Sequence, residues 1–258
     1  MGARLGQHFL RNTYYAALLA RECHALPTET ILEIGPGTGV LTRELLKTGA
    51  RVVAVEKDEA LAEQLTSTFA SEIAQATFTL LTMDVRDFKP EAHGLRRGEY
   101  VVAANIPYYI TGEIIRSFLT AECQPSRMLL LIQKEVATRI VSAKSSLLSL
   151  SVRVYGRPRI VAKVSAGNFS PPPKVDSAIL AIEHISAANF RHVSPEHFFA
   201  VLHAAFAAKR KLALNNIAQK WPKEAVTAAF IDNGVNIKAR AEEIPIEIWL
   251  SIARSLIS

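Results

Sequence analysis

Three glycines at alternate positions, Gly35, Gly37 and Gly39, constrain the fold of this chain more than any other feature. They follow the apolar run 30–34 and precede the helix-like segment 40–47. Because glycine has no Cβ atom, such a turn lets the backbone bend sharply and lets a ligand lie against it. The pattern therefore predicts a strand, a cofactor-binding turn and a helix in succession.

Strand-like and helix-like segments alternate through the first two thirds of the chain. The apolar runs predicted as strands cover residues 30–34, 51–56, 77–82, 100–104, 127–132, 160–165 and 177–185. The predicted helices among them cover residues 40–47, 59–69, 112–120 and 134–141. Repeated strand–helix units predict a parallel sheet with helices on both faces. A proline-rich loop without a helix joins the last two strands, so we expect these two to pair antiparallel.

The pattern changes near residues 186–194. Beyond this point the sequence shows helical periodicity only, over residues 195–207, 211–220, 223–232 and 244–256. We therefore expect an α/β protein of two domains. The first is a Rossmann-like domain over residues 1–187, and the second is a small all-helical domain over residues 188–258.

Composition and charge narrow the class of protein. Of the 258 residues, 49% are hydrophobic, and the net charge of +6 favours a polyanionic partner without identifying it as RNA. Cys23 and Cys123 lie far apart and neither belongs to a CxxC motif, so we expect no metal site. No apolar stretch is long enough to cross a bilayer, and the first residues lack the apolar core of a signal peptide. We expect a soluble cytoplasmic protein that binds neither a metal nor a membrane.

Two acidic residues stand at the ends of the strands that follow the glycine turn. Glu56 ends the second predicted strand, about 20 residues beyond the glycines, where a carboxylate can accept both ribose hydroxyls. Asp84 follows the third strand, where the amino group of an adenine would lie. A dinucleotide-binding fingerprint requires glycine where Val40 stands, and Pro36 interrupts the motif. The glycine turn, Glu56 and Asp84 together fit S-adenosylmethionine better than a dinucleotide, because S-adenosylmethionine has no pyrophosphate.

The segment 105–108, Asn-Ile-Pro-Tyr, follows the fourth predicted strand. The exocyclic amine of adenine is a poor nucleophile, because its lone pair is delocalised into the ring. The side-chain oxygen of Asn105 and a backbone carbonyl such as that of Ile106 can accept both N–H bonds and localise the lone pair. Pro107 fixes φ and has no N–H, which stiffens this geometry, and Tyr108 can stack on the base.

The glycine turn and this clamp together predict methyl transfer to the exocyclic nitrogen of a base. No dedicated general base is evident within residues 105–108. We therefore expect catalysis mainly by positioning and electrostatics, with an in-line attack on the methyl group.

The chain resembles the ribosomal RNA adenine N6-dimethyltransferase family over nearly its whole length. The segments that carry the resemblance are 6–10 (Gly-Gln-His-Phe-Leu), 33–39, 55–56, Asp84, 105–108, 133–137, 169–177, 209–211, 215–216 and 240–242. The start 6–10 and the Pro-Pro-Pro-Lys-Val-Asp-Ser segment at 171–177 are its most specific parts. The family usually has asparagine at the position of His8.

The resemblance implies a class I methyltransferase that depends on S-adenosylmethionine. Its substrate would be two adjacent adenosines near the 3′ end of small-subunit (16S) rRNA, in the small ribosomal subunit or a pre-30S particle. The cofactor-binding residues that it implies are His8, Leu10, Gly35, Gly37, Glu56, Asp84 and Asn105. The catalytic residues that it implies are Asn105, Pro107, Tyr108 and Phe169, with the flipped adenine between the rings of Tyr108 and Phe169.

Contacts with RNA are implied for a short basic cluster, Lys209, Arg210 and Lys211, which would face the phosphates. As a structural alternative, the same cluster is simply the solvated end of a helix. Nothing in the sequence demands a dimer, so we expect a monomer.

The nearest alternative is an enzyme of the same chemistry on large-subunit rRNA, of the erythromycin-resistance type. Enzymes of that type share the segment 105–108, so this segment does not discriminate. The segment 171–180 and the basic cluster 209–211 favour the small subunit.

Other classes of protein fit the sequence less well. A mainly non-catalytic ribosome-assembly factor would be expected to have lost Asn105, Tyr108 or Glu56, and all three are present. A DNA adenine methyltransferase would need an additional target-recognition domain. A nucleotide-dependent oxidoreductase is disfavoured by Val40 and by the clamp.

Overall fold

The computed structural model describes residues 8–257, and these form two compact units. The first contains the chain up to Thr138 together with Arg157–Ile185. The second contains Arg139–Gly156 together with the chain from Ser186 onwards. Residues 139–156 thus group with the C-terminal helices, whereas a division into functional domains at residue 187 remains a prediction.

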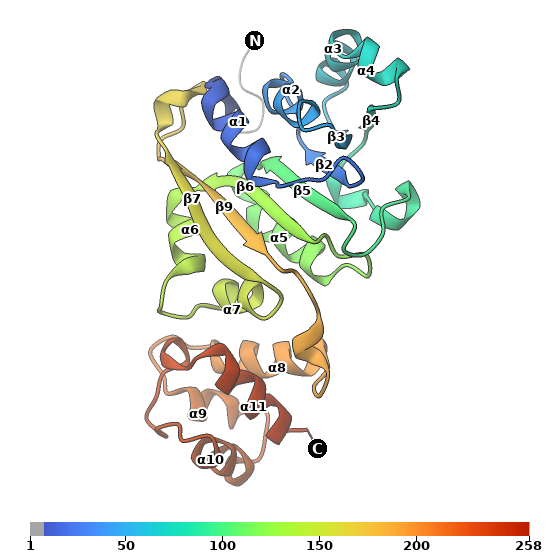
Figure 1. Cartoon of the computed structure of the whole chain (residues 1–258). Coiled ribbons are helices and arrows are strands. Elements are labelled where there is room, and N and C mark those ends of the chain that lie inside the picture. Colours follow the sequence, from blue (N-terminus) through green and yellow to red (C-terminus); the bar gives the residue numbers. More distant parts are fainter. Residues whose placement is uncertain (1–7, 258) are drawn as a thin grey trace. The chain divides into compact units, whose positions relative to one another are not determined.

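Within residues 8–257, the first unit contains a seven-stranded sheet (Figure 1). Its strands are β2 (Thr30–Ile34), β3 (Arg51–Glu56), β4 (Phe78–Thr82), β5 (Tyr100–Asn105), β6 (Arg127–Gln133), β7 (Arg157–Val164) and β9 (Ser177–Glu183). They lie in the order β4-β3-β2-β5-β6-β9-β7. The strands β4, β3, β2, β5 and β6 are parallel to one another. Strand β9 runs antiparallel to both of its neighbours, β6 and β7. The predicted antiparallel pairing of the last two long strands is therefore confirmed.

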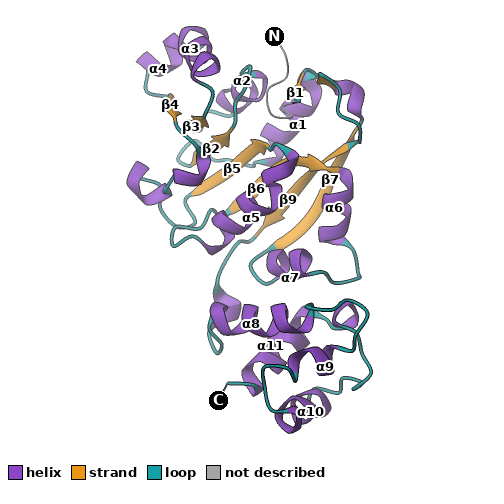
Figure 2. Cartoon of the chain, turned by 180° about the vertical axis from the view of Figure 1, so that it is seen from behind, coloured by secondary structure: helices purple, strands orange, loops and turns teal. Residues whose placement is uncertain are grey.

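The central strands are mostly apolar because helices cover both faces of the sheet. Ile31 of β2 lies between Val52 of β3 and Val101 of β5, and all three are fully buried. This face packs against helices α1 (Thr13–Glu22) and α2 (Val40–Leu46). Helix α5 (Thr111–Thr120) covers the opposite face (Figures 1 and 2).

The remaining helices near the sheet are α3 (Glu59–Thr68), α4 (Ala70–Ala74) and α6 (Lys134–Val141), together with the 3-10 turns η1 (Val85–Asp87), η2 (Pro90–His93), η3 (Tyr108–Ile110) and η4 (Ala166–Asn168). The side chain of Asp58 starts α3 by accepting hydrogen bonds from the N–H groups of Ala60 and Leu61, at 3.0 and 3.1 Å. This cap places the end of β3, and with it Glu56, at the edge of the sheet.

A two-stranded ribbon that the sequence pattern did not predict lies beside the sheet. It joins β1 (Phe9–Leu10) to β8 (Phe169–Ser170), with Leu10 opposite Phe169. The backbone N–H of Arg11 extends the pairing by donating to the carbonyl of Asn168 at 2.8 Å. The ribbon thereby brings the N-terminal segment next to the proline-rich loop, about 160 residues further along the chain.

The second unit is helical in its described part, as predicted. Its helices are α7 (Leu147–Arg153), α8 (Pro195–Ala205), α9 (Ala213–Ile217), α10 (Lys223–Asp232) and α11 (Ile246–Ser255), with the 3-10 turns η5 (Ala188–Phe190) and η6 (Ala241–Glu243). Trp249, Phe198 and Phe230 are its largest fully buried side chains. Helix α7 was not predicted. It belongs to the second unit, where the main-chain oxygen of Val154, the residue after α7, accepts a 2.7 Å hydrogen bond from the side chain of Asn189.

Candidate active site

Four parallel strands end at one edge of the sheet, and each delivers a residue that the sequence singled out. Gly35 follows β2, Glu56 ends β3, Asp84 follows β4 and Asn105 ends β5. The strand order reverses between β2 and β5, which makes this edge the topological switch point of the sheet. In open α/β sheets the crevice at such a switch point is the usual ligand site.

The glycine turn has the backbone geometry that its sequence requires. Gly35 and Gly37 have φ angles of +65° and +57°, which side chains rarely allow. A Cβ atom on Gly37 would lie 2.9 Å from the ring of Phe9, whereas nothing lies within 4 Å of one on Gly35. The ribbon therefore closes over one side of the turn and leaves open space beside Gly35, where the amino-acid part of a cofactor can approach the backbone.

The carboxylate of Glu56 is buried against this turn. It accepts hydrogen bonds from three backbone N–H groups: Gly37 at 3.1 Å, Lys57 at 2.9 Å and Asp58 at 3.0 Å. Only 4% of the residue is exposed. Because a carboxylate offers about four acceptor positions, Glu56 keeps little free capacity. Two ribose hydroxyls would have to replace part of this hydrogen bonding.

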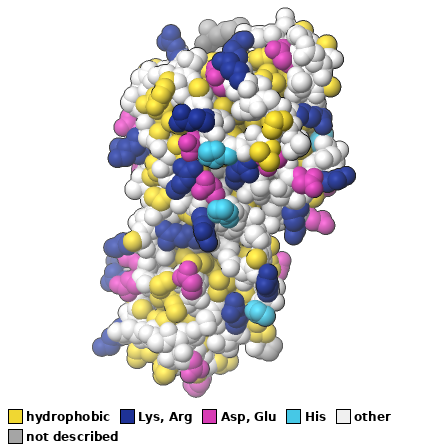
Figure 3. Space-filling model, in the orientation of Figure 1, with side chains coloured by type: hydrophobic (Ala, Val, Ile, Leu, Met, Phe, Trp, Pro, Cys, Tyr) yellow, Lys and Arg dark blue, Asp and Glu magenta, His cyan; other side chains and the backbone are white. Residues whose placement is uncertain are grey.

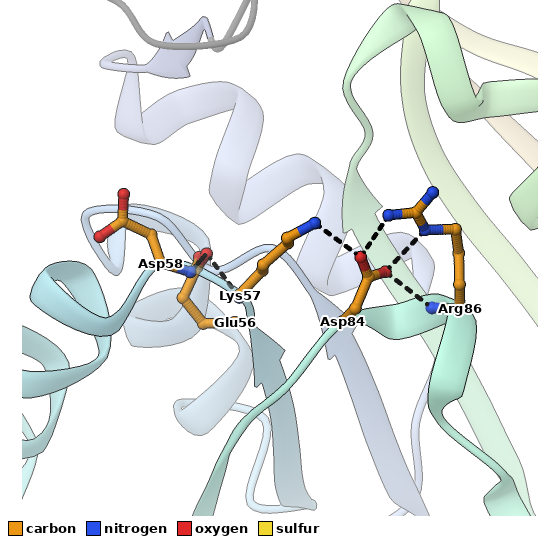
Figure 4. A network of polar contacts seen from close by, with 5 residues as sticks. All are labelled: Glu56, Lys57, Asp58, Asp84 and Arg86. Atoms are coloured by element: carbon orange, nitrogen blue, oxygen red, sulfur yellow. Dashed lines mark hydrogen bonds and ion pairs between the residues drawn. The ribbon is translucent and has the colours of Figure 1, made fainter.

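Asp84 lies between two cations (Figure 4). Lys57 Nζ donates to it at 2.8 Å, and Arg86 donates through Nη2 at 2.5 Å, Nε at 3.0 Å and its backbone N–H at 3.0 Å. The hydrogen bonds from Arg86 and Lys57 hold the pKa of Asp84 well below its ordinary value, so it is a carboxylate at neutral pH. The Lys57 and Arg86 side chains are largely exposed and can move aside for an adenine amino group.

Asn105 presents a free oxygen at the end of β5. Its Nδ2 atom donates to the main-chain oxygen of His8 at 2.9 Å. Because a carbonyl oxygen only accepts, this contact fixes which end of the amide is nitrogen. Among the described residues, neither Asn105 Oδ1 nor the Ile106 carbonyl oxygen receives a hydrogen bond. Both predicted acceptors thus lack a partner among the described residues, although Ile106 as a whole is only 1% exposed.

The side chain of Tyr108 stands half-buried beside this acceptor pair. Its hydroxyl group is 2.8 Å from Oγ of Ser177, the first residue of β9. Burial raises the pKa of the Tyr108 hydroxyl, so the ring is neutral in the physiological range. Pro107 precedes the short turn η3, and the N–H of Ile110 donates to its carbonyl at 3.2 Å. The hydroxyl bond and this turn together fix the orientation of the ring.

The N-terminal segment reaches the same place. The imidazole ring of His8 lies 5.7 Å from the Tyr108 ring, and its Nδ1 atom is 2.8 Å from the carbonyl oxygen of Pro171. Leu10, in strand β1 of the ribbon, is buried in the apolar core. Gly6 and Gln7, which belong to the same sequence motif, lie outside the described residues.

Phe169 is buried rather than open to the crevice. Only 3% of it is exposed, and it packs in the apolar core together with its ribbon partner Leu10. The structure thus places Phe169 near the N-terminal segment but does not present its ring to a base. A stack on adenine would require the β1–β8 ribbon to shift.

The basic cluster Lys209–Lys211 is an exposed turn between α8 and α9 of the second unit. Figure 3 shows Lys and Arg side chains spread over the visible face of the chain. The amide Nδ2 of Asn216 donates to the carbonyl oxygens of Ala205 at 2.8 Å and Ala208 at 3.1 Å. This buried side chain ties the turn to the end of α8, a role that the Asn-Asn motif alone did not reveal.

A second unpredicted feature is the buried carboxyl group of Glu33, in β2 just before the glycine turn. Neither its carboxyl oxygens nor Oγ1 of Thr42 has a hydrogen-bond partner among the described residues. Burial raises the pKa of Glu33 to about 8, against a smaller lowering by nearby Thr42. An acidic residue within an otherwise apolar strand was the available signal.

Residues 8–257 contain no group of three or more His, Cys, Asp or Glu residues that could hold a metal ion. None of their helices is long and apolar enough to cross a membrane.

The sheet order and the residues at its edge define a class I methyltransferase of Rossmann-like fold, the class that uses S-adenosylmethionine. The fold is similar to the crystal structure of the 23S rRNA methyltransferase ErmE, with a TM-score of 0.76 and 25% identity over 97% of this chain and all of that one. It is also similar to a dimethyladenosine transferase from Plasmodium falciparum, with a TM-score of 0.80 and 22% identity over 95% of this chain and 96% of that one.

The chain belongs to the ribosomal RNA adenine dimethylase family, whose sequence model matches residues 2–258. It is 39% identical to the ribosomal RNA small subunit methyltransferase A of Dehalococcoides mccartyi, over 95% of this chain and 84% of that protein. It is 34% identical to the protein of the same name from Thermosynechococcus vestitus, over 98% of this chain and 96% of that protein. The resemblance seen in the sequence is confirmed, and the chain is a methyltransferase enzyme.

Proposed function

We propose that this enzyme dimethylates N6 of two adjacent adenosines near the 3′ end of small-subunit (16S) rRNA during ribosome maturation. The observation that carries the proposal is the free oxygen of Asn105 beside the free carbonyl of Ile106, at the edge where the glycine turn lies. Two acceptors side by side suit an exocyclic amine, which has two N–H bonds to donate. The relatives named small subunit methyltransferase A support the choice of RNA.

The strand ends suit the parts of S-adenosylmethionine in this proposal. Its amino-acid part would lie in the open space beside Gly35, and its ribose at the Glu56 carboxylate. Asp84 would accept from the adenine amino group, while His8, Leu10 and Asn105 would enclose the cofactor from the other side. When bound, the cofactor supplies an electrophilic methyl group on a cationic sulfur.

The clamp would make the amine of the target adenosine a better nucleophile. Acceptance of both N–H bonds by Asn105 and Ile106 favours a pyramidal nitrogen with a localised lone pair. Tyr108 would hold the flipped base by stacking, with Pro107 stiffening the backbone between them. Phe169 would complete the stack after a shift of the ribbon.

Binding to the ribosomal particle would use the exposed cluster Lys209, Arg210 and Lys211. Three neighbouring cations on one turn suit the phosphate backbone of RNA, which supplies most of the affinity of such complexes and makes it sensitive to salt. We further propose that the enzyme acts as a monomer in the cytoplasm on the small subunit or a pre-30S particle.

Because the fold is similar to that of the 23S rRNA methyltransferase ErmE, 23S rRNA is the alternative candidate substrate. The higher identity to proteins named for the small subunit disfavours it. The discriminating experiment supplies labelled S-adenosylmethionine to unmethylated small and large subunits in parallel and identifies the modified nucleoside by mass. N6,N6-dimethyladenosine in the small subunit alone is the expected result, and label in the large subunit would reverse the assignment.

A further inference from the structure

Ser177 is a polar residue at the start of a buried, apolar strand. It is the first residue of β9, whose next five residues are all apolar, and it is fully buried. A buried hydroxyl group costs free energy unless it is hydrogen-bonded. Among the described residues, the hydrogen-bond partner of Ser177 Oγ is the hydroxyl group of Tyr108, at 2.8 Å. The bond to this tyrosine therefore explains why the strand tolerates a serine here.

The backbone at Ser177 is held from both sides of its strand. Strand β9 lies between β6 and β7, and Ser177 is in register with Gln133 on the first and Val164 on the second. The residue before it, Asp176, accepts a 3.0 Å hydrogen bond from the N–H of Lys134 through its main-chain oxygen. The hydroxyl group of Ser177 is therefore a fixed point of the sheet.

Tyr108 is held less firmly by its own backbone. It opens the 3-10 turn η3, which has only three residues, and the hydrogen bonds of such turns have poorer geometry than those of an α-helix. The residue is half-buried, and the neighbouring ring of His8 lies 5.7 Å away, tilted by 34° rather than stacked flat. The bond from the hydroxyl group to Ser177 is thus the contact that holds the far end of the Tyr108 ring.

The proline-rich loop before β9 contacts the proposed clamp at both of its ends. At its start, the carbonyl oxygen of Pro171 lies 2.8 Å from Nδ1 of His8, whose main-chain oxygen accepts from Asn105 Nδ2 at 2.9 Å. At its end, Ser177 is bonded to Tyr108, which is 69 positions earlier in the chain. One loop thus holds both members of the clamp relative to each other.

The bond to Ser177 also decides which part of Tyr108 is left for a substrate. Its hydroxyl group is engaged with a fully buried oxygen, and burial raises its pKa, so it stays protonated at neutral pH. A hydroxyl group in this state is a poor candidate for acid–base chemistry on the adenosine. The ring remains, and stacking is what a flipped base requires of it.

We propose that Ser177 is a positioning residue for methyl transfer, whose hydroxyl group holds the Tyr108 ring in the orientation that stacks on the target adenosine. The inference rests on the proposed function and deepens it, because it assigns the tyrosine hydroxyl group to the protein and the ring to the substrate. Ser177 itself would contact neither the adenosine nor the cofactor.

The role is tested by single-turnover methylation of unmethylated small subunits, with subunits and S-adenosylmethionine both saturating. Ser177→Ala and Tyr108→Phe each remove the bond, and each should slow the reaction about tenfold, near the upper end of what one neutral hydrogen bond contributes. The double variant should be no slower than either single variant, because there is one bond to lose. Affinities for the cofactor and for small subunits should stay at their wild-type values.

Two further variants separate the bond from packing. Ser177→Cys nearly fills the volume of serine, but its thiol is a weak hydrogen-bond partner, so it should be slowed like Ser177→Ala. Ser170→Ala, which removes an exposed hydroxyl group from the neighbouring strand β8, is the matched control and should keep the wild-type rate.

Three kinetic results would overturn the role of Ser177 and leave the proposed function intact. A wild-type rate in Ser177→Cys would mean that the side chain only fills space. A Tyr108→Phe variant far slower than Ser177→Ala would mean that the tyrosine hydroxyl group acts on the substrate directly. Losses that multiply in the double variant would mean that the two residues act independently.

The anchor itself is measurable without turnover. In protein labelled with ¹³C-tyrosine, the ring resonances of Tyr108 are identified by their loss in Tyr108→Phe. They should shift or broaden in Ser177→Ala and remain unchanged in Ser170→Ala; unchanged resonances in Ser177→Ala would overturn the proposal. A wild type that methylates neither subunit would instead defeat the proposed function, while the resonances would still show whether Ser177 holds the ring.

Discussion

Asn105 and His8 are 97 positions apart in the chain, and a 2.9 Å hydrogen bond from the side-chain amide of one to the main-chain oxygen of the other joins them. The bond uses the nitrogen of the amide and leaves its oxygen without a partner among the described residues. The N-terminal segment therefore helps to orient the proposed clamp.

Asn105→Ala should abolish methylation while largely sparing the affinity for S-adenosylmethionine. It removes an acceptor aimed at the reacting amine, and loss of one such preorganised group typically costs 10²–10³ in kcat. Single-turnover rates and calorimetric cofactor binding measure the two effects. Near-normal turnover would show that the Asn105 oxygen is not an essential acceptor.

Glu56→Gln should weaken cofactor binding at least about tenfold, because a neutral amide replaces a carboxylate that is meant for two hydroxyl donors. It should also lower the free energy of unfolding, since three backbone N–H groups donate to this side chain. Isothermal calorimetry and urea unfolding measure the two changes. If affinity is unchanged while stability falls, Glu56 has only a structural role in the turn.

The stability of the protein should depend on pH through Glu33. Its pKa is about 8 in the folded state against an ordinary value of 4.5, so the unfolded chain binds fewer protons between these values. The free energy of unfolding should therefore be highest below about pH 4.5, as far as Glu33 is concerned, and should decline towards pH 8. Glu33→Gln, which cannot ionise, should flatten this decline and be more stable than wild type at pH 8. Parallel slopes in urea unfolding at pH 5, 6.5 and 8 would contradict the prediction.

Asn216→Asp should loosen the basic turn, because a carboxylate cannot donate to the carbonyls of Ala205 and Ala208. We expect a loss of about 1–3 kcal/mol in stability, the usual effect of leaving buried acceptors unpaired. Affinity for small subunits should fall with it. Asn215→Asp is the matched control. The side chain of Asn215 is exposed, and this substitution changes the charge by the same amount as Asn216→Asp. Equal behaviour of the two variants would mean that Asn216 does not hold the turn.

Lys211→Glu should weaken binding to small subunits and reduce its salt dependence. If Lys211 neutralises a phosphate, the slope of log affinity against log salt should fall by about one. Filter binding between 50 and 200 mM salt, with Lys223→Glu as a control of equal charge on α10, provides the measurement. If the salt slope of Lys211→Glu equals that of Lys223→Glu, the cluster Lys209–Lys211 is an ordinary solvated surface.

Local sequence patterns predicted the sheet well, because its central strands are short apolar runs that end in glycine or polar residues. The bounds of β2 and β3 agree with those predicted. Asn105 was expected just after the strand 100–104, and it is the last residue of β5. Helix α7 escaped prediction because its start depends on Ser146, whose side chain caps the backbone of Ser149 within a polar stretch.

The parts of the site that the sequence could not reveal depend on contacts between distant segments. The pairing of Leu10 with Phe169 forms a ribbon of two residues on each side, too short for any periodicity. The burial of Phe169 and the contact of His8 Nδ1 with the Pro171 carbonyl oxygen both accompany that ribbon. The motifs predicted these residues as members of the site, but only the packed structure shows which of them are buried and which residues they contact.

The grouping of residues 139–156 with the C-terminal helices means that the chain passes between the two units at 138/139, 156/157 and 185/186. Neither unit is a continuous piece of sequence. A truncation at residue 187 would therefore leave α7, with its buried residues Leu150 and Val152, without its packing partners. The helical unit is not a portable module that can be removed or exchanged by a single cut, and chimaeras that aim to transplant RNA specificity must carry α7 along with the C-terminal helices.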